Sequence, residues 1–416
     1  MDSMSETEYE AQMSNIPNAR FFDHSTQPHI ATLIILSSIS ALASHMFLPS
    51  LPLMAVHFES TPAVLGLSVS IFLGASAILQ LAAGPLSDLY GRRPVTLWAL
   101  VIFTVTSAFI AYAPNIETFL ALRAIQAIAA CCVVVSRAVV RDTTETAASG
   151  SKLGYVTMGM ALVPMLSPIL GGFLDGWLGW QSNFWFLTCI GALIWLICYF
   201  DQGETAPPST HKITSQFAEY AELLKARRFW GYCISSALGA GAFFAFLGGG
   251  PFVGSVVFNL TPEALGIYIG VPAIGYILGN FLSGRFSRQI GIDRMVLWGL
   301  LITMAGMSLS LLVSYAGYGS ATSFFGLMTF VGLGNGITMP NATAGMLSVR
   351  PHLAGAASGL GSAIMIGGGA ALSAARGLIL KPGSSEMPLV CLMWLSAAGG
   401  VLCILYVRRR NATLRD

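Results

Sequence analysis

Long apolar runs recur along the whole chain and restrict its possible folds more than any other feature. Each run holds about 20 residues, and six runs lie on either side of a charged segment. About 20 apolar residues in a helix cross the hydrocarbon of a bilayer, where only helices and closed barrels satisfy the backbone. The sequence therefore predicts an all-α polytopic membrane protein with twelve transmembrane helices. The runs lie near residues 29–53, 62–86, 94–113, 117–140, 153–174, 183–200, 229–257, 262–286, 295–315, 321–347, 353–380 and 387–407.

The composition excludes an ordinary soluble domain. Hydrophobic residues make up 55% of the 416 residues and charged residues only 10%, whereas soluble proteins are about a quarter charged. A net charge of +2 gives no reason to expect nucleic acid as a partner. The chain has no Gly-x-x-x-x-Gly-Lys-Ser/Thr loop, no metal-ligand cluster and no nucleophile with a base beside it. We expect neither an enzyme nor a cofactor, and the energy source is then an ion gradient or the gradient of the substrate itself.

The charged segment divides the chain into two halves, which we expect to form two pseudo-symmetric six-helix bundles. Lys and Arg gather in the loops on the side of both termini, whereas the opposite loops hold Lys381 alone. This asymmetry predicts that both termini are cytoplasmic. The expected segments are a disordered acidic tail (1–28), the first bundle (29–200), a cytoplasmic linker (201–228), the second bundle (229–407) and a basic tail (408–416).

The loop between the second and third runs reads Gly-Pro-Leu-Ser-Asp-Leu-Tyr-Gly-Arg-Arg-Pro over residues 84–94. Gly91 permits a positive φ at the turn, and Pro94 suits the first turn of the next helix. We expect Arg92 and Arg93 to lie in water beside lipid headgroups. Asp88 is then available to pair with an arginine or to cap a helix. The alternative is an ordinary positively charged loop; the candidate gate residues here are Gly84, Asp88, Gly91, Arg92 and Arg93.

A weak echo of this loop occurs 200 residues later. Gly284 and Gly291 stand where Gly84 and Gly91 stood, and Arg288 replaces the aspartate. The echo falls in the equivalent loop of the second half, as a pair of repeats related by an axis along the membrane normal requires.

The fourth and fifth runs carry polar and helix-bending residues. Arg123 and Gln126 are three residues apart on one face of the fourth run. An arginine inside the bilayer is normally turned toward a cavity or a partner, and the alternative is a snorkelling arginine near the helix end. Arg141 and Asp142 end this run and are expected to pair with loop charges. The fifth run holds a Pro/Gly pattern that favours a bend and close helix packing: Pro164, Pro168, Gly171 and Gly172.

Several of these strings resemble one family. The 84–94 loop resembles the signature between helices two and three of the major facilitator superfamily, and Pro164 to Gly172 resembles its antiporter motif, with Ser167 in place of a glycine. Residues 44–52, 250–253 and 351–358 resemble the Bcr/CflA drug:proton antiporters, the bicyclomycin- and chloramphenicol-resistance type. The resemblance covers residues 29–407. It implies a monomer in the bacterial inner membrane that exchanges small amphipathic drugs or metabolites for protons.

One residue departs from the resembled subfamily. Where that subfamily has a membrane-embedded Asp, this chain has His45 in the first run. An unperturbed imidazole titrates near pH 6.5, so His45 could carry protons in place of the carboxylate together with Arg123. The alternative is a histidine that only packs, in a carrier for a single metabolite without carboxylate-based proton coupling. We expect no other Asp or Glu deep in a span, since Asp175 and Glu117 fall near the outer surface.

A cavity between the two halves is expected to bind the substrate. Aromatic side chains on the seventh and eighth runs can form an adaptable wall for planar apolar molecules, although aromatic residues on helices more often belong to a core. A membrane sensor or scaffold is disfavoured because the tails are too short for a signalling domain. The candidate cavity residues are Gln126, Phe243, Phe246, Tyr268 and Asn335.

Overall fold

The computed structural model describes residues 21–143, 163–164, 166–206, 220–350, 353–379 and 383–413. Within these ranges the regular structure is helical, without strands. Ten helices are long and apolar enough to cross a membrane, by length and composition. The predicted all-α fold is therefore confirmed. Of the twelve predicted spans, the fifth is described only from residue 163, and the tenth consists of a short helix followed by one rich in small and polar residues.

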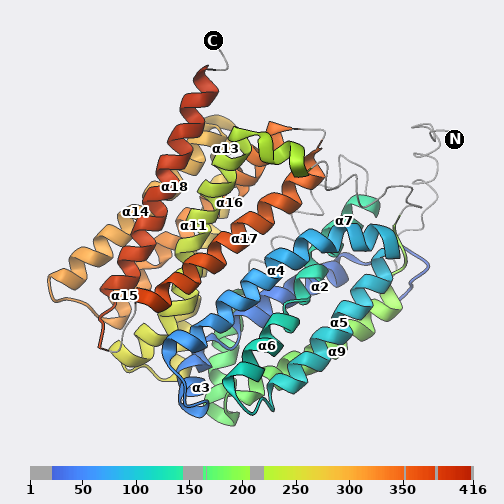
Figure 1. Ribbon diagram of the computed structural model, residues 1–416, viewed down its shortest axis with the longest axis horizontal. Coiled ribbons are helices and arrows are strands. Elements are labelled where there is room, and N and C mark those ends of the chain that lie inside the picture. Colours follow the sequence, from blue (N-terminus) through green and yellow to red (C-terminus); the bar gives the residue numbers. More distant parts are fainter. Residues whose placement is uncertain are drawn as a thin grey trace.

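The helices form two groups that lie side by side in Figure 1, one from each half of the sequence. The first group holds α2 (Ile30–His45), a short 3-10 helix (Leu48–Ser50), α3 (Leu51–His57), α4 (Pro62–Tyr90), α5 (Arg92–Ile110), α6 (Ile116–Gln126), α7 (Ala129–Thr143), a helix over residues 166–178, and α9 (Gln181–Asp201). The second group holds α11 (Arg227–Phe252), a π-helical turn (Val253–Val257), α12 (Pro262–Gly270), α13 (Pro272–Ile290), α14 (Ile292–Tyr315), α15 (Ala321–Leu327), α16 (Thr329–Val349), α17 (Ala354–Ile379) and α18 (Met387–Thr413).

Several predicted spans are interrupted helices. Prolines explain two of the interruptions: Pro49 lies in the 3-10 helix that separates α2 from α3, and Pro272 begins α13 directly after α12 ends. A proline lacks an N–H group and its ring clashes with the preceding turn, so a helix ends before it. Pro85, Pro251 and Pro340 instead lie inside α4, α11 and α16.

The two groups contact each other near one end of the bundle. We call the end with the 84–94 loop the motif end, and the end with Leu48–Ser50 and Pro262 the opposite end. A Cβ on Gly74 of α4 would lie 4.0 Å from that of Ala370 on α17, and one on Gly377 would lie 3.6 Å from that of Ala63. Gly84, near the motif end of α4, has nothing within 4 Å of such a Cβ. The small-residue contact between the halves thus lies toward the opposite end.

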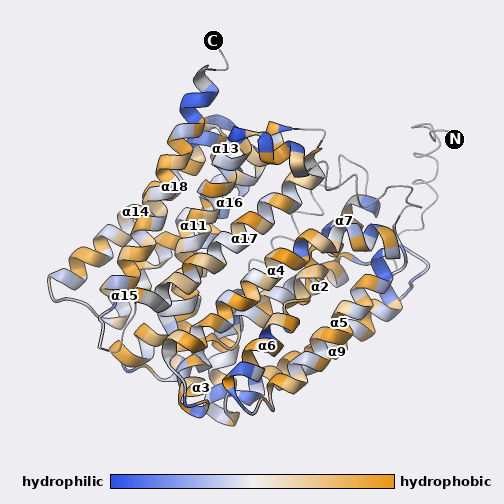
Figure 2. Ribbon diagram, viewed as in Figure 1, coloured by the Kyte–Doolittle hydropathy of each residue, from blue (hydrophilic) through white to orange (hydrophobic). Residues whose placement is uncertain are grey.

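The outer surface of the bundle is apolar along the helices. Ile78, Trp98, Phe281 and Leu402 are each about two-thirds exposed on four different helices. In Figure 2 hydrophobic ribbon covers most of the helix lengths, and hydrophilic segments gather toward the helix ends. Such a surface fits lipid rather than water.

Candidate functional site

The repeat seen in the sequence coincides with a repeat in backbone geometry. Gly91 joins α4 to α5 with φ 96° and ψ 153°, and Gly291 joins α13 to α14 with φ 89° and ψ 148°. Residues with a side chain rarely adopt these angles. The predicted positive φ at Gly91 is confirmed, and Pro94 lies in the first turn of α5 as expected.

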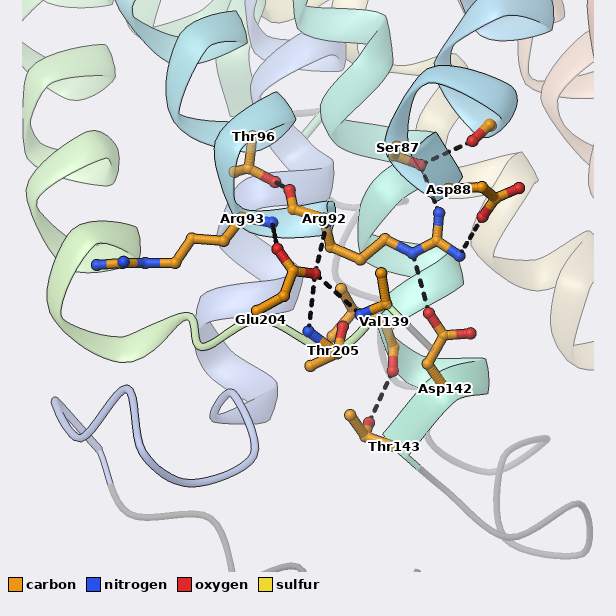
Figure 3. A network of polar contacts seen from close by, with 12 residues as sticks. Ser87, Asp88, Arg92, Arg93, Thr96, Val139, Asp142, Thr143, Glu204 and Thr205 are labelled. Carbon is orange, nitrogen blue, oxygen red and sulfur yellow. Dashed lines mark hydrogen bonds and ion pairs between the residues drawn. The ribbon is translucent and has the colours of Figure 1, made fainter. Parts of the chain in front are cut away.

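Arg92 lies at the centre of a polar network at the motif end (Figure 3). Its side chain is 1% exposed, so the expectation that it lies in water is wrong. Nη2 pairs with Asp88 Oδ1 at 2.5 Å, and Nε pairs with Asp142 Oδ2 at 2.9 Å. Nη1 donates to Ser87 Oγ at 2.5 Å. Asp88 and Asp142 thus each pair with Arg92, as predicted for an aspartate beside an arginine and for a helix-end residue beside a loop charge. The side chain of Arg141 lies outside the described part.

The linker contributes a carboxylate that sequence reasoning missed. Glu204 accepts the backbone N–H of Arg92 at 2.8 Å and that of Arg93 at 3.2 Å, and so caps α5 (Figure 3). Arg93 is half-buried, donates to the Tyr199 carbonyl at 2.8 Å and lies over the Tyr199 ring. Asp201 accepts the backbone N–H groups of Phe22 and His29 at 2.9 Å each. Residues 21–28 and 201–206 are therefore held against the first bundle, although we expected the former within a disordered tail and the latter within a linker.

We predict that Asp142→Ala lowers the free energy of unfolding by about 3 kcal/mol. Removing one partner of a buried ion pair costs about 3–5 kcal/mol, and Asp88 still compensates part of the Arg92 charge. A matched control is Glu222→Ala, which breaks the Arg350–Glu222 pair at 3.2 Å, in which both side chains are about half exposed. That change should cost under about 1 kcal/mol. Equal losses for the two variants in detergent-mixture unfolding would contradict the assignment.

Arg123 is fully buried inside the first bundle and does not line an open cavity, contrary to expectation. Its guanidinium carbon lies 4.2 Å from the ring centroid of Phe47 and 4.5 Å from that of Phe72. Nη1 donates to the Ala43 carbonyl at 3.1 Å and to Gln126, whereas Nε and Nη2 have no hydrogen-bond partner. Within the described ranges no carboxylate pairs with it. Arg123 is thus a buried cation that contacts two aromatic rings and has two nitrogen atoms, Nε and Nη2, without an acceptor.

His45 lies at the contact between the two halves. It ends α2, is 6% exposed, and its ring stacks on Phe243 of α11 with centroids 6.2 Å apart. Nδ1 lies 2.7 Å from the Ala41 carbonyl and 2.8 Å from Ser44 Oγ. A carbonyl only accepts, so Nδ1 carries a hydrogen and donates it to Ala41. Nε2 is buried without a partner and is the ring atom available to a proton or a substrate donor.

The five candidate cavity residues do not form one cluster. Phe243 and Phe246 lie together, with ring centroids 6.4 Å apart. Phe325 connects them to Tyr268: its ring centroid lies 5.9 Å from that of Phe246 and 5.1 Å from that of Tyr268. Gln126 instead lies with Arg123 and donates to Ser107 Oγ at 2.8 Å. Asn335 is buried on α16 and takes part in none of these ring contacts. The structure thus brings His45 to the aromatic residues and places Gln126 deeper in the first bundle.

The Pro/Gly pattern of the fifth span makes close contacts in two directions. A Cβ on Gly171 would overlap the Met46 carbonyl in the same half, and one on Gly172 would overlap the Pro262 carbonyl in the other half. Pro168 is buried and its carbonyl lies against Gly266, while Pro164 is half-buried. The prediction that these glycines allow close approach is confirmed.

Comparison with known proteins agrees with these features. A family model described as the Major Facilitator Superfamily matches residues 33–374. A chloramphenicol resistance protein of Pseudomonas aeruginosa is 29% identical over 395 residues, covering 91% of each chain. A bicyclomycin resistance protein homolog of Haemophilus influenzae is 27% identical over 346 residues, covering 81% of this chain and 85% of that protein. The resemblance inferred from residues 44–52 and 84–94 is therefore confirmed.

Solved structures share the fold at low sequence identity. The crystal structure of a POT family transporter in complex with 5-aminolevulinic acid gives a TM-score of 0.77 at 11% identity. The match covers 97% of this chain and 100% of that one. It extends over both halves.

Proposed function

Because the chain belongs to the Major Facilitator Superfamily, we propose that it exports small amphipathic drugs or metabolites in exchange for protons by alternating access. The transporter acts as a monomer in the bacterial inner membrane, with both termini in the cytoplasm. The two halves rock so that a site between them faces first one side of the membrane and then the other. The names of the relatives, chloramphenicol and bicyclomycin resistance proteins, support the substrate class.

His45 is the observation that carries this proposal. Its imidazole is buried at the contact between the halves, with Nδ1 held by Ala41 and Nε2 without a partner. Titration of an imidazole occurs within the pH range in which such a transporter works. In the proposed cycle Nε2 takes a proton from the outer side and releases it to the cytoplasm, while substrate moves outward.

Arg123 supplies the charge that makes proton and substrate exclude each other. It donates to the carbonyl of Ala43, two residues along α2 from Ala41, which holds His45. Protonation of His45 therefore places a second positive charge next to one that has no described carboxylate partner. Like charges in a low-dielectric interior repel strongly. The substrate binds beside neutral His45 and leaves when His45 is protonated.

A carrier for a single anionic metabolite is the second candidate. The observation that favours it is the same unpaired Arg123, whose free Nη2 and Nε donors suit a carboxylate or phosphate group. In that case Arg123 binds the substrate directly, and His45 packs against Phe243 without changing its charge.

Purified protein in vesicles with an imposed pH gradient distinguishes the two candidates. For one-for-one electroneutral exchange we expect about tenfold substrate accumulation per pH unit, since about 1.4 kcal/mol corresponds to tenfold. Substrate should also drive proton movement, read with an internal pH dye. Exchange of an anionic metabolite without proton flux between about pH 5.5 and 8 would favour the second candidate.

A further inference from the structure

A buried carboxylate lies at the opposite end of the bundle, and the export cycle described above does not use it. Asp175 belongs to the helix over residues 166–178 and was expected near the outer surface. It is only 5% exposed, and neither carboxylate oxygen has a hydrogen-bond partner. Burying a carboxylate in its charged form without partners costs several kcal/mol. The burial comes from packing between the halves and not from depth in the span.

The groups around Asp175 are polar and acidic. Two side chains lie close enough to act on its carboxyl group: Ser50 favours the charged form, and the Glu263 carboxylate opposes it. Asn183 of α9 donates from Nδ2 to Ser50 Oγ at 2.9 Å, and its own Oδ1 is buried without a partner. In the described part of the chain no basic side chain pairs with Asp175 or Glu263. His57 of α3 makes an edge-on contact with Trp180, and in the described ranges it pairs with neither carboxylate.

Asp175 and Glu263 come from different halves and meet where the halves touch. A Cβ on Gly176, the residue after Asp175, would overlap the Glu263 carboxylate. A Cβ on Gly172, three residues before Asp175, would overlap the Pro262 carbonyl. Contact at this end therefore brings a second carboxylate beside a buried one, and separation of the halves removes that neighbour.

We propose that Asp175 binds a proton when the two halves touch at the opposite end and releases it when they separate. Glu263 is half-buried and lies in the first turn of α12, where the helix dipole favours its negative charge. Asp175 is the more buried of the two and does not lie at a helix N-terminus, so it is the member of the pair that takes the proton. The O–H group formed is a donor, and the unpartnered Asn183 Oδ1 and the Ser50 hydroxyl are acceptors in the same polar cluster.

The sign of the pH dependence follows from this arrangement. The closed form of the opposite end binds one proton more than the open form, so acid favours closure. One proton changes the ratio of closed to open molecules by up to about tenfold per pH unit. The inference rests on the proposed alternating access, but it concerns an equilibrium that exists without substrate. Its test therefore fails or succeeds separately from the export assay.

The test measures the distance across the opposite end as a function of pH. Spin labels are introduced through a non-canonical amino acid at Tyr112 and Tyr318, which are 71% and 77% exposed in the two halves. In substrate-free protein in lipid discs we expect the short-distance population to grow as pH falls from about 8.5 to about 5. Asp175→Asn, a neutral isostere of the protonated acid, should hold the short distance at every pH.

Two glutamate variants complete the test. Glu263→Gln removes the negative charge that opposes closure while Asp175 is ionised, so closure should occur at a higher pH than in wild type and depend less on pH. Glu117→Gln is the matched control, since Glu117 is also in a first helical turn but is exposed in the other half, and it should leave the midpoint unchanged. Should Asp175→Asn fail to fold, the comparison of the two glutamate variants still decides.

Three results would overturn the proposal. They are a wild-type distance distribution that is independent of pH, an Asp175→Asn protein that still titrates, and equal midpoints for the two glutamate variants. Replacing sodium by potassium at constant pH should change nothing. A shift with sodium would assign the pair of carboxylates to a metal cation instead of a proton.

Discussion

Arg123→Met is expected to abolish transport while leaving the protein at least as stable as wild type. Arg123 is a buried cation with two unused donors and no carboxylate in the described part of the chain. The Phe47 and Phe72 rings replace part of the hydration free energy that the guanidinium loses on burial, since a desolvated cation–π contact is worth about 2 kcal/mol. Methionine fills similar volume without burying a charge, and replacing buried charges by apolar groups often stabilises by about 1–4 kcal/mol.

The transport defect should be large because a desolvated charge is lost from the proposed site. A hydrogen bond that involves a charged group is worth about 1.5–3 kcal/mol, which corresponds to a loss of at least about tenfold in exchange rate. Both quantities are measured on the same preparation, by unfolding in detergent mixtures and by counterflow in vesicles. Arg123→Lys should retain part of the transport, since it keeps the charge and loses the planar stacking.

Arg92→Met is the matched control for this prediction. Arg92 is equally buried, but it pairs with Asp88 and Asp142, so its removal leaves a buried carboxylate without its partner. We expect Arg92→Met to lose about 3 kcal/mol of stability. A loss of stability in Arg123→Met as large as that in Arg92→Met, with transport retained, would make Arg123 a structural residue.

These two arginines also show what sequence reasoning can and cannot reach. The helical character of both spans and the turn at Gly91 follow from apolar length and from glycine chemistry, and they were predicted. Which arginine is neutralised depends on partners far along the chain. Asp142 and Glu204 lie 50 and 112 residues from Arg92. No local pattern links these positions, so the network had to be read from the structure.

Gln126 was misjudged and the burial of Asp175 was missed for related reasons. Helical spacing places Gln126 on the same face as Arg123, but it does not say that this face turns into the first bundle and away from Phe243. Distance from a loop places Asp175 near the outer end of its span, but it does not say that glycines 172 and 266 allow the other half to cover it. Burial between two halves depends on tertiary packing, and the periodicity of one helix does not predict it.

His45→Asn is expected to uncouple transport from the proton gradient without preventing exchange. The asparagine amide can donate to the Ala41 carbonyl as Nδ1 does, so the end of α2 keeps its hydrogen bond. It cannot take up a proton near neutral pH. Accumulation should fall from about tenfold per pH unit to simple equilibration, while counterflow exchange stays within about threefold of wild type.

The pH profile and two further variants make this prediction specific to His45. Exchange by wild type should change with pH across the range in which an imidazole titrates, and exchange by His45→Asn should not. His45→Asp restores the carboxylate that the resembled subfamily has at this place, and it should regain proton-driven accumulation. His57→Asn is the control, because His57 is exposed and makes an edge-on contact with Trp180 at the opposite end. If His45→Asn accumulates substrate like wild type, the proton is carried elsewhere, and Asp175 becomes the leading coupling residue.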